Sequence, residues 1–433
     1  MTTPAEETGP GAGEVPVSVL VREEIGRFVA MVVALVLAAG CILASPFLQP
    51  PYLLSIIVIL FSSIMYLIRG TRGLSVSIII LAVLYGIGWL PLPIFSLTLA
   101  IVAAGEIAYR AAAGGHHRYL TYLAASSAGG GIAALYFAAI GYLELRPLVL
   151  LLLLLGVLVA VLLKAALQGR SDILMVEGLG VAMTMYLFSD LSMPVENLGL
   201  LTAAAGIALS FGYIAYRLRV ADVSGLFSGA IVGIIIIVFS DVRWFLVMLA
   251  FLVIGSGSTR YRYEAKAAAG IAESHGGVRG YLNVFANGLV GVAAAVLYGI
   301  SGGNPLCIAL YLGSIATAAA DTMGGEIGMT SRDPVLITTL APVAKGTNGG
   351  ITLVGEAASL VASAAIALSA FLLGIGDVRM LLAVAAAGFA GANVDSLVGA
   401  LAENRGFIGN AGTNLLATLS GGLVALLILL AIG

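Results

Sequence analysis

The chain has 433 residues, of which 61% are hydrophobic and 10% are charged, and its mean hydropathy is +1.11. Soluble domains carry about 25% charged residues, so this composition excludes a soluble globular protein, and the net charge of −2 gives no indication of nucleic-acid binding. Runs such as 147–163 and 415–432 are long enough, or nearly so, to cross about 30 Å of hydrocarbon. A β-barrel would instead show short strands of alternating polarity. We therefore predict an all-α polytopic membrane protein.

In chain order, residues 1–20 are polar and rich in Pro, Gly and Glu, which is typical of a flexible tail and not of a signal peptide. Fifteen apolar segments follow, and several connections between them carry the helix breakers Pro or Gly, as at 49–51 and 301–304. The predicted membrane-spanning segments are 28–48, 52–68, 74–90, 92–108, 119–143, 147–164, 173–190, 197–215, 225–240, 243–257, 281–300, 304–320, 350–375, 380–400 and 409–432.

Lysines and arginines are distributed unevenly between the two sides of these segments. Seventeen of the 20 fall on one side, and only Arg146, Arg243 and Arg379 fall on the other. Because basic residues accumulate on the cytoplasmic side of membrane proteins, the chain is predicted to be a multi-pass protein of the cell membrane. Its N-terminus would be cytoplasmic and its C-terminus outside, and the polar connections described next would face the cytoplasm.

The chain also resembles itself along its length. The stretches 105–114 and 320–328 each end a segment that runs in the same direction. Together with the order of the later segments, this predicts two parallel seven-helix repeats joined by one helix. The predicted boundaries are 21–195 for the first repeat, 196–219 for the linking helix and 220–433 for the second repeat.

The first repeat carries Glu106, His116, His117 and Arg118 where the second carries two carboxylates, a lysine and a glycine pair. The first repeat is therefore predicted to be a scaffold. In the second, Asp321 and the nearby Glu326 stand at a predicted helix end, where carboxylates can hold a hard cation such as Mg²⁺.

The next polar stretch is KGTNGG, which lacks the spacing of a Walker A motif. Glycines let backbone N–H groups approach an anion, the following helix would begin directly after them, and the lysine supplies a point charge for phosphate. Thr347 or Asn348 would cap that helix. The residues of the KGTNGG stretch are Lys345, Gly346, Thr347, Asn348, Gly349 and Gly350.

Two carboxylates are predicted inside apolar helices, Glu356 more than one turn into its segment and Asp395 in the next. A buried carboxylate in a membrane helix is costly unless it faces protein or water, so both indicate function. Asn410 and Asn414 begin the last segment one turn apart. The basic loop 255–280 would either contact lipid headgroups or clamp a phosphorylated substrate, and the sequence leaves both open.

Five ordered motifs, GSGSTRYRYEAKAAAGIAE, ADTMGGEIG, VAKGTNGGITLVGEAAS, GANVDSLVGALAE and IGNAGTNLLATLSGG, resemble the transmembrane protein 19 family. That family includes the plant phytyl-phosphate kinases, and the resemblance covers roughly 220–433. The chain departs from it at 323–325, where many members carry a Trp-Ala-Ser-like stretch. The first repeat looks like a faint version of the dolichol kinase and CDP-archaeol synthase group without its Lys and Glu.

The resemblance implies a membrane kinase that converts a phytyl- or geranylgeranyl-type polyprenyl monophosphate to the diphosphate, with CTP or another nucleoside triphosphate and Mg²⁺. Phosphoryl transfer needs positioning and charge neutralisation more than covalent catalysis. The expected catalytic residues are Lys345, Asp321 and Asp395. The expected metal ligands are Asp321, Glu326, Glu356 and Asp395. The expected nucleotide contacts are Gly346, Thr347, Asn348, Gly349, Gly350, Asn414 and Arg260.

Three other functions stay open from the sequence. A CTP-dependent lipid cytidylyltransferase would use the same site and differ only in which phosphorus is attacked. A lipid or small-molecule transporter would place its polar groups nearer the membrane midplane. A structural protein without chemistry is disfavoured by the two intramembrane carboxylates. The expected partners are a prenyl phosphate lipid, a nucleotide and membrane lipids.

Overall fold

The computed structural model describes residues 25–432 with short gaps, and the predicted tail at 1–20 lies outside this range. The first predicted segment, 28–48, is described only in part. The gaps are at 26–27, 30–31, 34, 38, 42, 45–46, 69–70, 113, 116, 192–194 and 196.

The chain divides into two compact units, and each is described by itself. Unit 1 comprises residues 1–145 with 167–186, and unit 2 comprises 146–166 with 187–433. The helices of unit 1 are α2 (Pro51–Tyr66), α3 (Arg72–Gly86), α4 (Leu92–Ala111), α5 (His117–Ala139) and most of α7 (Ile173–Asp190). The predicted pair of superposable repeats stays a prediction.

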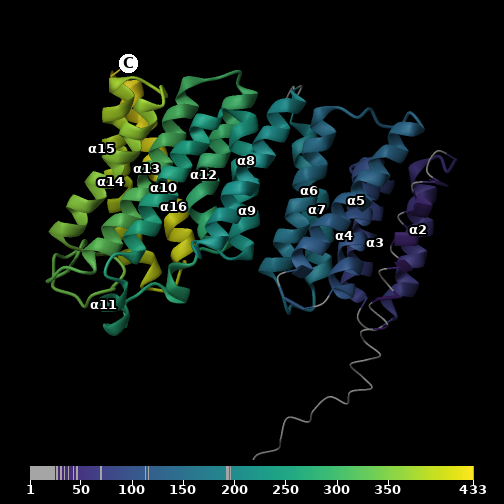
Figure 1. The fold of residues 1–433 in the computed structure, drawn as a ribbon, viewed down its shortest axis with the longest axis horizontal. Coiled ribbons are helices and arrows are strands. Elements are labelled where there is room, and N and C mark those ends of the chain that lie inside the picture. Colours follow the sequence, from purple (N-terminus) through teal and green to yellow (C-terminus); the bar gives the residue numbers. More distant parts are fainter. Residues whose placement is uncertain are drawn as a thin grey trace, which may run out of the picture. The chain divides into compact units, whose positions relative to one another are not determined.

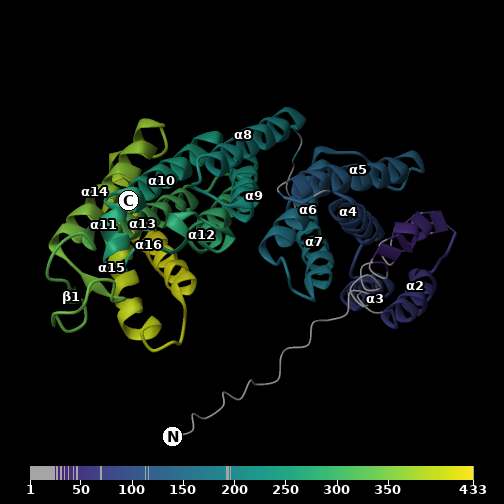
Figure 2. The same cartoon turned by 60° about the horizontal axis from the view of Figure 1, so that its bottom comes forward.

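Unit 2 is a larger helical bundle, and its residues 187–433 are coloured from teal to yellow in Figures 1 and 2. Its first elements are α6 (Pro147–Ala166), α8 (Leu198–Arg217), α9 (Val223–Phe239), α10 (Val242–Arg260), α11 (Tyr263–Ala268), η1 (Ser274–Gly277) and α12 (Tyr281–Ile300). The remaining elements are α13 (Pro305–Gly328), β1 (Val335–Leu336), β2 (Gly350–Ile351), α14 (Leu353–Leu372), α15 (Val378–Val398), η2 (Gly399–Glu403) and α16 (Asn410–Ile432).

The helices confirm the predicted fold class. Fourteen of the fifteen predicted segments coincide with a helix from α2 to α16. In the described part of the chain, eleven helices are long and apolar enough to cross a membrane, and α2, α3 and α9 are shorter apolar helices. The chain is thus an all-α polytopic membrane protein, as its apolar composition requires.

Helix α13 is the central helix of unit 2. It packs against α10, α12, α14, α15 and α16, and residues such as Tyr311 and Ile315 are completely buried there. Small residues allow this close packing, as is usual between membrane helices. A Cβ atom on Gly313 would lie 2.6 Å from the carbonyl oxygen of Gly421 on α16, so only glycine fits.

The connection between α13 and α14 differs from the prediction at both ends. Helix α13 continues two turns beyond the predicted end at residue 320, so Asp321 and Glu326 lie on a helix and not in a loop. The glycine pair does not start the next helix, because Gly350 belongs to β2, which pairs antiparallel with β1. The actual N-cap of α14 is Thr352, whose hydroxyl accepts a hydrogen bond from the Gly355 N–H at 3.0 Å.

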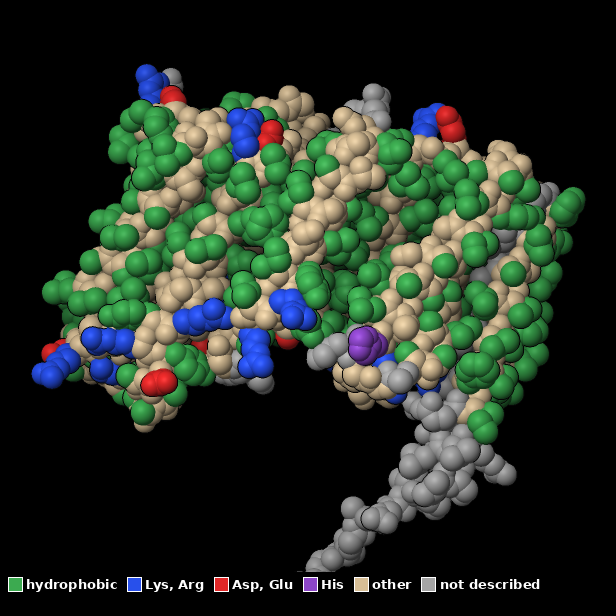
Figure 3. Space-filling model, in the orientation of Figure 1, with side chains coloured by type: hydrophobic (Ala, Val, Ile, Leu, Met, Phe, Trp, Pro, Cys, Tyr) green, Lys and Arg blue, Asp and Glu red, His purple; other side chains and the backbone are tan. Residues whose placement is uncertain are grey.

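Charged side chains of unit 2 follow the predicted asymmetry. In Figure 3, hydrophobic side chains cover the flanks of the helices, and Lys and Arg gather at the end of the bundle where α11 lies. At the opposite end, Arg243 forms an ion pair with Asp241 at 3.1 Å, and the pKa of Asp241 is lowered because hydrogen bonds from Arg243 outweigh burial. Which end faces the cytoplasm stays a prediction from the positive-inside rule.

Candidate functional site

One cavity of about 340 Å³ gathers the polar clusters that the sequence singles out. It lies among the ends of α12 to α16 and the connection that carries β1 and β2. Residues from the stretches 320–328, 345–350, 391–403 and 409–422 therefore line one cavity. Of the predicted site residues, those that line it are Asp321, Glu326, Lys345, Gly346, Thr347, Asn348, Gly349, Gly350, Glu356, Asp395 and Asn414.

Asp321 and Asp395 come together because α13 and α15 approach closely one turn earlier. A Cβ atom on Gly391 would overlap the side chain of Thr317, so the missing side chain permits the crossing. Four residues further along each helix stand Asp321 and Asp395, whose carboxyl groups are close enough to interact directly. Oδ1 of Asp395 is buried and has no hydrogen-bond partner. Two adjacent carboxylates repel each other unless a proton or a cation lies between them.

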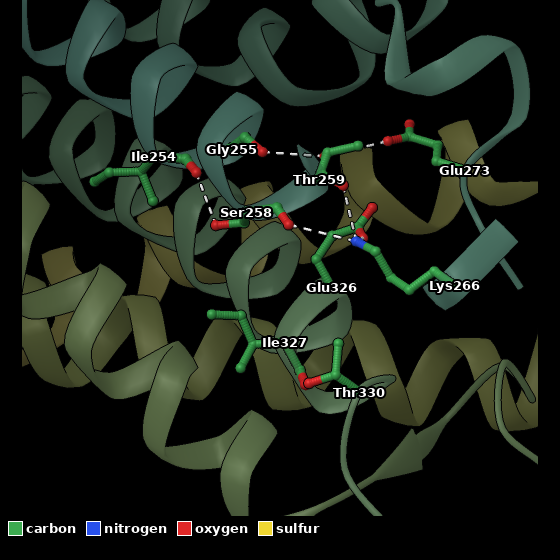
Figure 4. A network of polar contacts seen from close by, with 9 residues as sticks. All are labelled: Ile254, Gly255, Ser258, Thr259, Lys266, Glu273, Glu326, Ile327 and Thr330. Carbon is green, nitrogen blue, oxygen red and sulfur yellow. Dashed lines mark hydrogen bonds and ion pairs between the residues drawn. The ribbon is translucent and has the colours of Figure 1, made fainter. Parts of the chain in front are cut away.

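Glu326 is occupied in another way (Figure 4). It is buried, and its carboxylate forms an ion pair with Nζ of Lys266 on α11. Nζ also donates to the Thr259 carbonyl at 2.8 Å, so the partners of this ammonium group belong to the protein itself. Glu326 borders the cavity, but its charge is already compensated.

Glu356 lies in the first turn of α14, so the prediction that it sits more than one turn inside the helix is wrong. The cause is the later helix start, at Leu353. Its Oε2 accepts a hydrogen bond from Asn393 Nδ2 at 3.0 Å. A carboxylate at this place is favoured by the helix dipole, and the amide ties α14 to α15.

The glycines of the KGTNGG stretch serve its turns and its packing. Gly346 and Gly349 have φ values of +80° and +79°, which other residues rarely adopt. A Cβ atom on Gly349 would lie 2.6 Å from the carbonyl oxygen of Ser396, so the loop presses against the end of α15. The N–H of Gly350 donates to the Thr347 carbonyl at 2.9 Å and is therefore not available to an anion.

Three cationic side chains, one in the KGTNGG stretch and two in the basic loop 255–280, have very different surroundings. Lys345 is exposed and lines the cavity, and among the described residues it forms no hydrogen bond or ion pair. Arg260 does not line the cavity and donates to the Leu218 carbonyl at 2.7 Å. Arg279 does line it, is only 5% exposed, and its Nε atom has no hydrogen-bond partner.

Two further polar residues near the start of α12, Asn283 and Asn287, also line the cavity and are not among the predicted site residues. They are one turn apart in an apolar segment, as Asn410 and Asn414 are in α16. The same spacing signal was therefore present. It is weak, because buried amides also join helices, and Asn287 Nδ2 donates to the Asn283 carbonyl at 3.0 Å.

The four predicted metal ligands do not form one cluster. Within the described residues, no group of three or more His, Cys, Asp or Glu side chains is arranged to hold a metal ion. Glu326 pairs with Lys266 and Glu356 with Asn393, which leaves Asp321 and Asp395. This pair fits Mg²⁺, which commonly binds one or two carboxylates together with substrate phosphates, and the unpartnered Oδ1 of Asp395 is a free ligand atom.

Comparison with known proteins agrees with the membrane fold. The chain matches the family described as Integral membrane protein DUF92 over residues 206–422. It is 38% identical over 211 residues to an uncharacterized membrane protein of Methanocaldococcus jannaschii, covering 48% of this chain and 86% of that protein. Protein PGR of Arabidopsis thaliana is 29% identical over 226 residues, covering 46% of this chain and 78% of PGR.

Protein VTE6, chloroplastic, of Arabidopsis thaliana is 34% identical over 124 residues, covering 28% of this chain and 37% of that protein. No solved structure matches the chain. The match at 206–422 spans half of the sequence and contains every residue that lines the cavity. On this evidence, the chain belongs to the integral membrane protein family DUF92.

Proposed function

We propose that unit 2 is a membrane kinase that transfers the γ-phosphoryl group of CTP to a polyprenyl monophosphate. The observation that carries the proposal is the composition of the cavity. The adjacent carboxylates of Asp321 and Asp395 and the uncompensated ammonium group of Lys345 line one space between membrane helices. A nucleotide–Mg²⁺ complex and a second phosphate need these opposite charges side by side.

The carboxylate pair would hold Mg²⁺, and bound Mg²⁺ would neutralise part of the charge on the nucleotide phosphates. Lys345 lies on the connection between α13 and α14 and is free to approach a phosphoryl group. Its positive charge stabilises the negative charge that develops on the transferred group. Asn348 and Asn414 border the same space and are amide donors for the nucleotide.

The reaction balances without a strong base. A phosphate oxygen of the prenyl monophosphate attacks the γ-phosphorus of CTP, the bond between that phosphorus and the β-γ bridging oxygen breaks, and CDP leaves with that oxygen. The acceptor oxygen is already anionic, so no proton has to be removed from it. The protein therefore needs to align two anions and offset their repulsion, which is the main demand of phosphoryl transfer.

The family resemblance supports the identity of the substrates. The motifs ADTMGGEIG, VAKGTNGGITLVGEAAS, GANVDSLVGALAE and IGNAGTNLLATLSGG carry the likeness to the plant phytyl-phosphate kinases, and each contributes residues to the cavity. The position of the polar groups supports an enzyme over a transporter. They lie at the ends of α13, α14, α15 and α16, whereas transporters bind their cargo near the midplane at broken helices.

The test uses purified full-length protein in detergent with geranylgeranyl phosphate, phytyl phosphate and CTP labelled on either the α- or the γ-phosphorus. A kinase produces a lipid diphosphate labelled only from γ-labelled CTP. A cytidylyltransferase produces a lipid labelled only from α-labelled CTP. The other nucleoside triphosphates are added unlabelled, as competitors. If the lipid carries label from neither form of CTP, transfer from CTP is refuted.

A further inference from the structure

A second cavity of unit 2 is apolar and has a volume of about 90 Å³. It lies among α8, α9, α10 and the start of α12. Small residues and aromatic rings make up most of its wall. Its apolar wall includes Ala208, Phe211, Gly229, Val232, Phe245 and Phe251.

The apolar cavity and the polar cavity meet at two residues. Arg279 and Asn283 line both of them. Asn283 is on α12, and Arg279 lies two residues before the start of that helix at Tyr281. One face of this pair therefore borders a hydrocarbon-like space, and the other borders the space that contains Asp321 and Lys345.

The structure holds the Arg279 backbone firmly at this junction. Its N–H donates to the Val220 carbonyl at 2.9 Å, and its carbonyl accepts from the Asp222 N–H at 3.2 Å. The guanidinium lies over the Phe251 ring, with 5.3 Å between Cζ and the ring centroid. The geometry of the guanidinium is thus set before a ligand arrives.

The guanidinium has lost most of its water without gaining a full set of partners. Burial lowers the pKa of Arg279 from its ordinary value, and Glu273 and Glu326 oppose this effect. Both carboxylates are engaged elsewhere, since Glu273 accepts from Thr259 Oγ1 at 3.3 Å and Glu326 pairs with Lys266. A buried charge without partners is costly, so this cation is suited to bind an anionic ligand group.

We infer that Arg279 binds the phosphate of the lipid acceptor, and that the apolar cavity holds the isoprene units next to that phosphate. The identity of the lipid rests on the proposed function. An amphiphile with one phosphate and one hydrocarbon chain places its head and tail on opposite sides of Arg279, as the two cavities require. The cavity volume of about 90 Å³ suits one hydrocarbon chain better than the two acyl chains of a membrane phospholipid. Gly229 leaves room for a methyl branch of an isoprenoid, since a Cβ atom there would have no heavy atom within 4 Å.

Gly229 provides a sharp test of the chain site. It lines the apolar cavity on α9, and a Cβ atom there would have no heavy atom within 4 Å, so a larger side chain enters empty space. Gly206 on α8 also has no heavy atom within 4 Å of such a Cβ, but it does not line the cavity. Gly229→Leu therefore fills the site, and Gly206→Leu is its matched control for helix propensity.

The experiment measures binding to full-length protein in detergent by calorimetry without nucleotide. The probes are geranylgeranyl phosphate, geranylgeraniol, inorganic phosphate and dioleoyl phosphatidic acid. We expect Gly229→Leu to weaken binding of geranylgeranyl phosphate by roughly tenfold or more, as loss of a few methylene contacts does in a hydrophobic pocket. Gly206→Leu should bind like the parent, and phosphatidic acid should not displace the prenyl lipid.

Arg279→Gln tests the head-group site, with Arg217→Gln at the exposed end of α8 as the control. A hydrogen bond to a charged group contributes enough that its loss should weaken geranylgeranyl phosphate roughly 10- to 100-fold. Binding of geranylgeraniol should not change. Gly255→Ala is a second variant, because a Cβ atom there would lie 2.5 Å from an Nη atom of Arg279 and would displace the guanidinium.

The outcomes separate this inference from the proposed function. If the parent turns over geranylgeranyl phosphate but Gly229→Leu binds it equally well, the lipid site is wrong and the kinase stands. If the parent binds the lipid with both dependences but transfers no phosphoryl group, the kinase is wrong and the lipid site stands. Binding that Arg279→Gln leaves unchanged, or displacement by phosphatidic acid, would overturn the inference.

Discussion

Helices α4 and α5 of unit 1 and helices α13 and α14 of unit 2 pack through the same kind of contact. In unit 1, Ser126 Oγ donates to the Ile101 carbonyl at 2.9 Å, and Gly105 gives the hydroxyl room. In unit 2, Ser359 Oγ donates to the Ala320 carbonyl at 2.9 Å, and a Cβ atom on Gly324 would overlap that hydroxyl. In both pairs the glycine follows the accepting residue by four positions.

The two pairs differ one turn away from this contact. Four residues before the serine stands Tyr122 in unit 1 and Gly355 in unit 2. Tyr122 is completely buried, and its hydroxyl lies 3.4 Å from Glu177 Oε2. Gly355 has no side chain, and it lines the polar cavity.

The charged groups differ in the same way. In unit 1, Val102 follows the residue with the accepting carbonyl, and Leu123 follows Tyr122. In unit 2 the corresponding residues are Asp321 and Glu356. Glu106 of unit 1 pairs with Arg110 one turn along its own helix at 2.6 Å. One packing scheme thus carries an arrangement filled by a tyrosine ring in unit 1, where Glu106 pairs with Arg110, and an arrangement open to a charged cavity in unit 2, where the candidate site lies.

The largest effect should follow from breaking the ion pair between Lys266 and Glu326. Lys266→Met leaves a buried carboxylate without its partner, and such a change costs about 3–5 kcal/mol of the free energy of unfolding. Thermal unfolding in detergent measures the loss. Lys266→Met combined with Glu326→Leu should recover much of it, because no buried charge is left uncompensated. A double variant less stable than the single one would show that the pair does not act in this way.

The next effect concerns Lys345, which has no counterpart in unit 1. Lys345→Ala removes a charge beside the transferred phosphoryl group, so turnover of the prenyl monophosphate should fall roughly 10²-fold or more. Because Lys345 is exposed and forms no interaction among the described residues, the melting temperature should not change. Arg332→Ala removes an exposed charge from the same connection and is the control. Equal losses in both variants would point to a general electrostatic effect.

A smaller effect should distinguish the two glycine contacts. Gly324→Ala overpacks the interface between α13 and α14 and should cost about 1–3 kcal/mol. Adding Ser359→Ala removes the overlapping hydroxyl and should restore part of the stability. In unit 1, Gly105→Ala should not be rescued by Ser126→Ala, because ring atoms of Tyr122 would still lie 2.7 Å from the new Cβ. Urea or thermal unfolding of the four variants measures the difference, and rescue in both units would contradict it.

The sequence predicts the helices well because the signal is length and hydrophobicity, which the membrane imposes on every spanning segment. It fails at the end of α13, where Gly324 and Gly325 look like helix breakers. Gly324 is instead a packing glycine within the helix. A single sequence does not distinguish these two uses, because the difference lies in the neighbouring helix.

The sequence predicts those residues of the candidate site that stand out one by one, as charged residues in apolar surroundings. Asp395 and Lys345 are conspicuous in apolar surroundings, and both line the cavity. Pairings were not predicted, since Lys266 and Glu326 are 60 residues apart and their contact depends on where α11 packs. Arg279 is buried beside the cavity, whereas Arg260 donates to the Leu218 carbonyl. The sequence of a loop that carries several basic residues does not show which of them is buried.

Turnover of Asp395→Asn and His117→Ala over a range of Mg²⁺ concentrations tests most directly whether the carboxylate pair of unit 2 is the metal–phosphate site. Asn keeps the size of Asp395 but binds Mg²⁺ more weakly, so the rate should fall roughly 10²-fold and recover in part at high Mg²⁺. His117 of unit 1 is exposed, and its replacement should leave turnover and its Mg²⁺ dependence unchanged. Thermal unfolding establishes that both variants are folded. If the Asp395→Asn variant works like the parent while the His117→Ala variant is folded but inactive, the active site lies in unit 1 and its assignment to unit 2 is wrong.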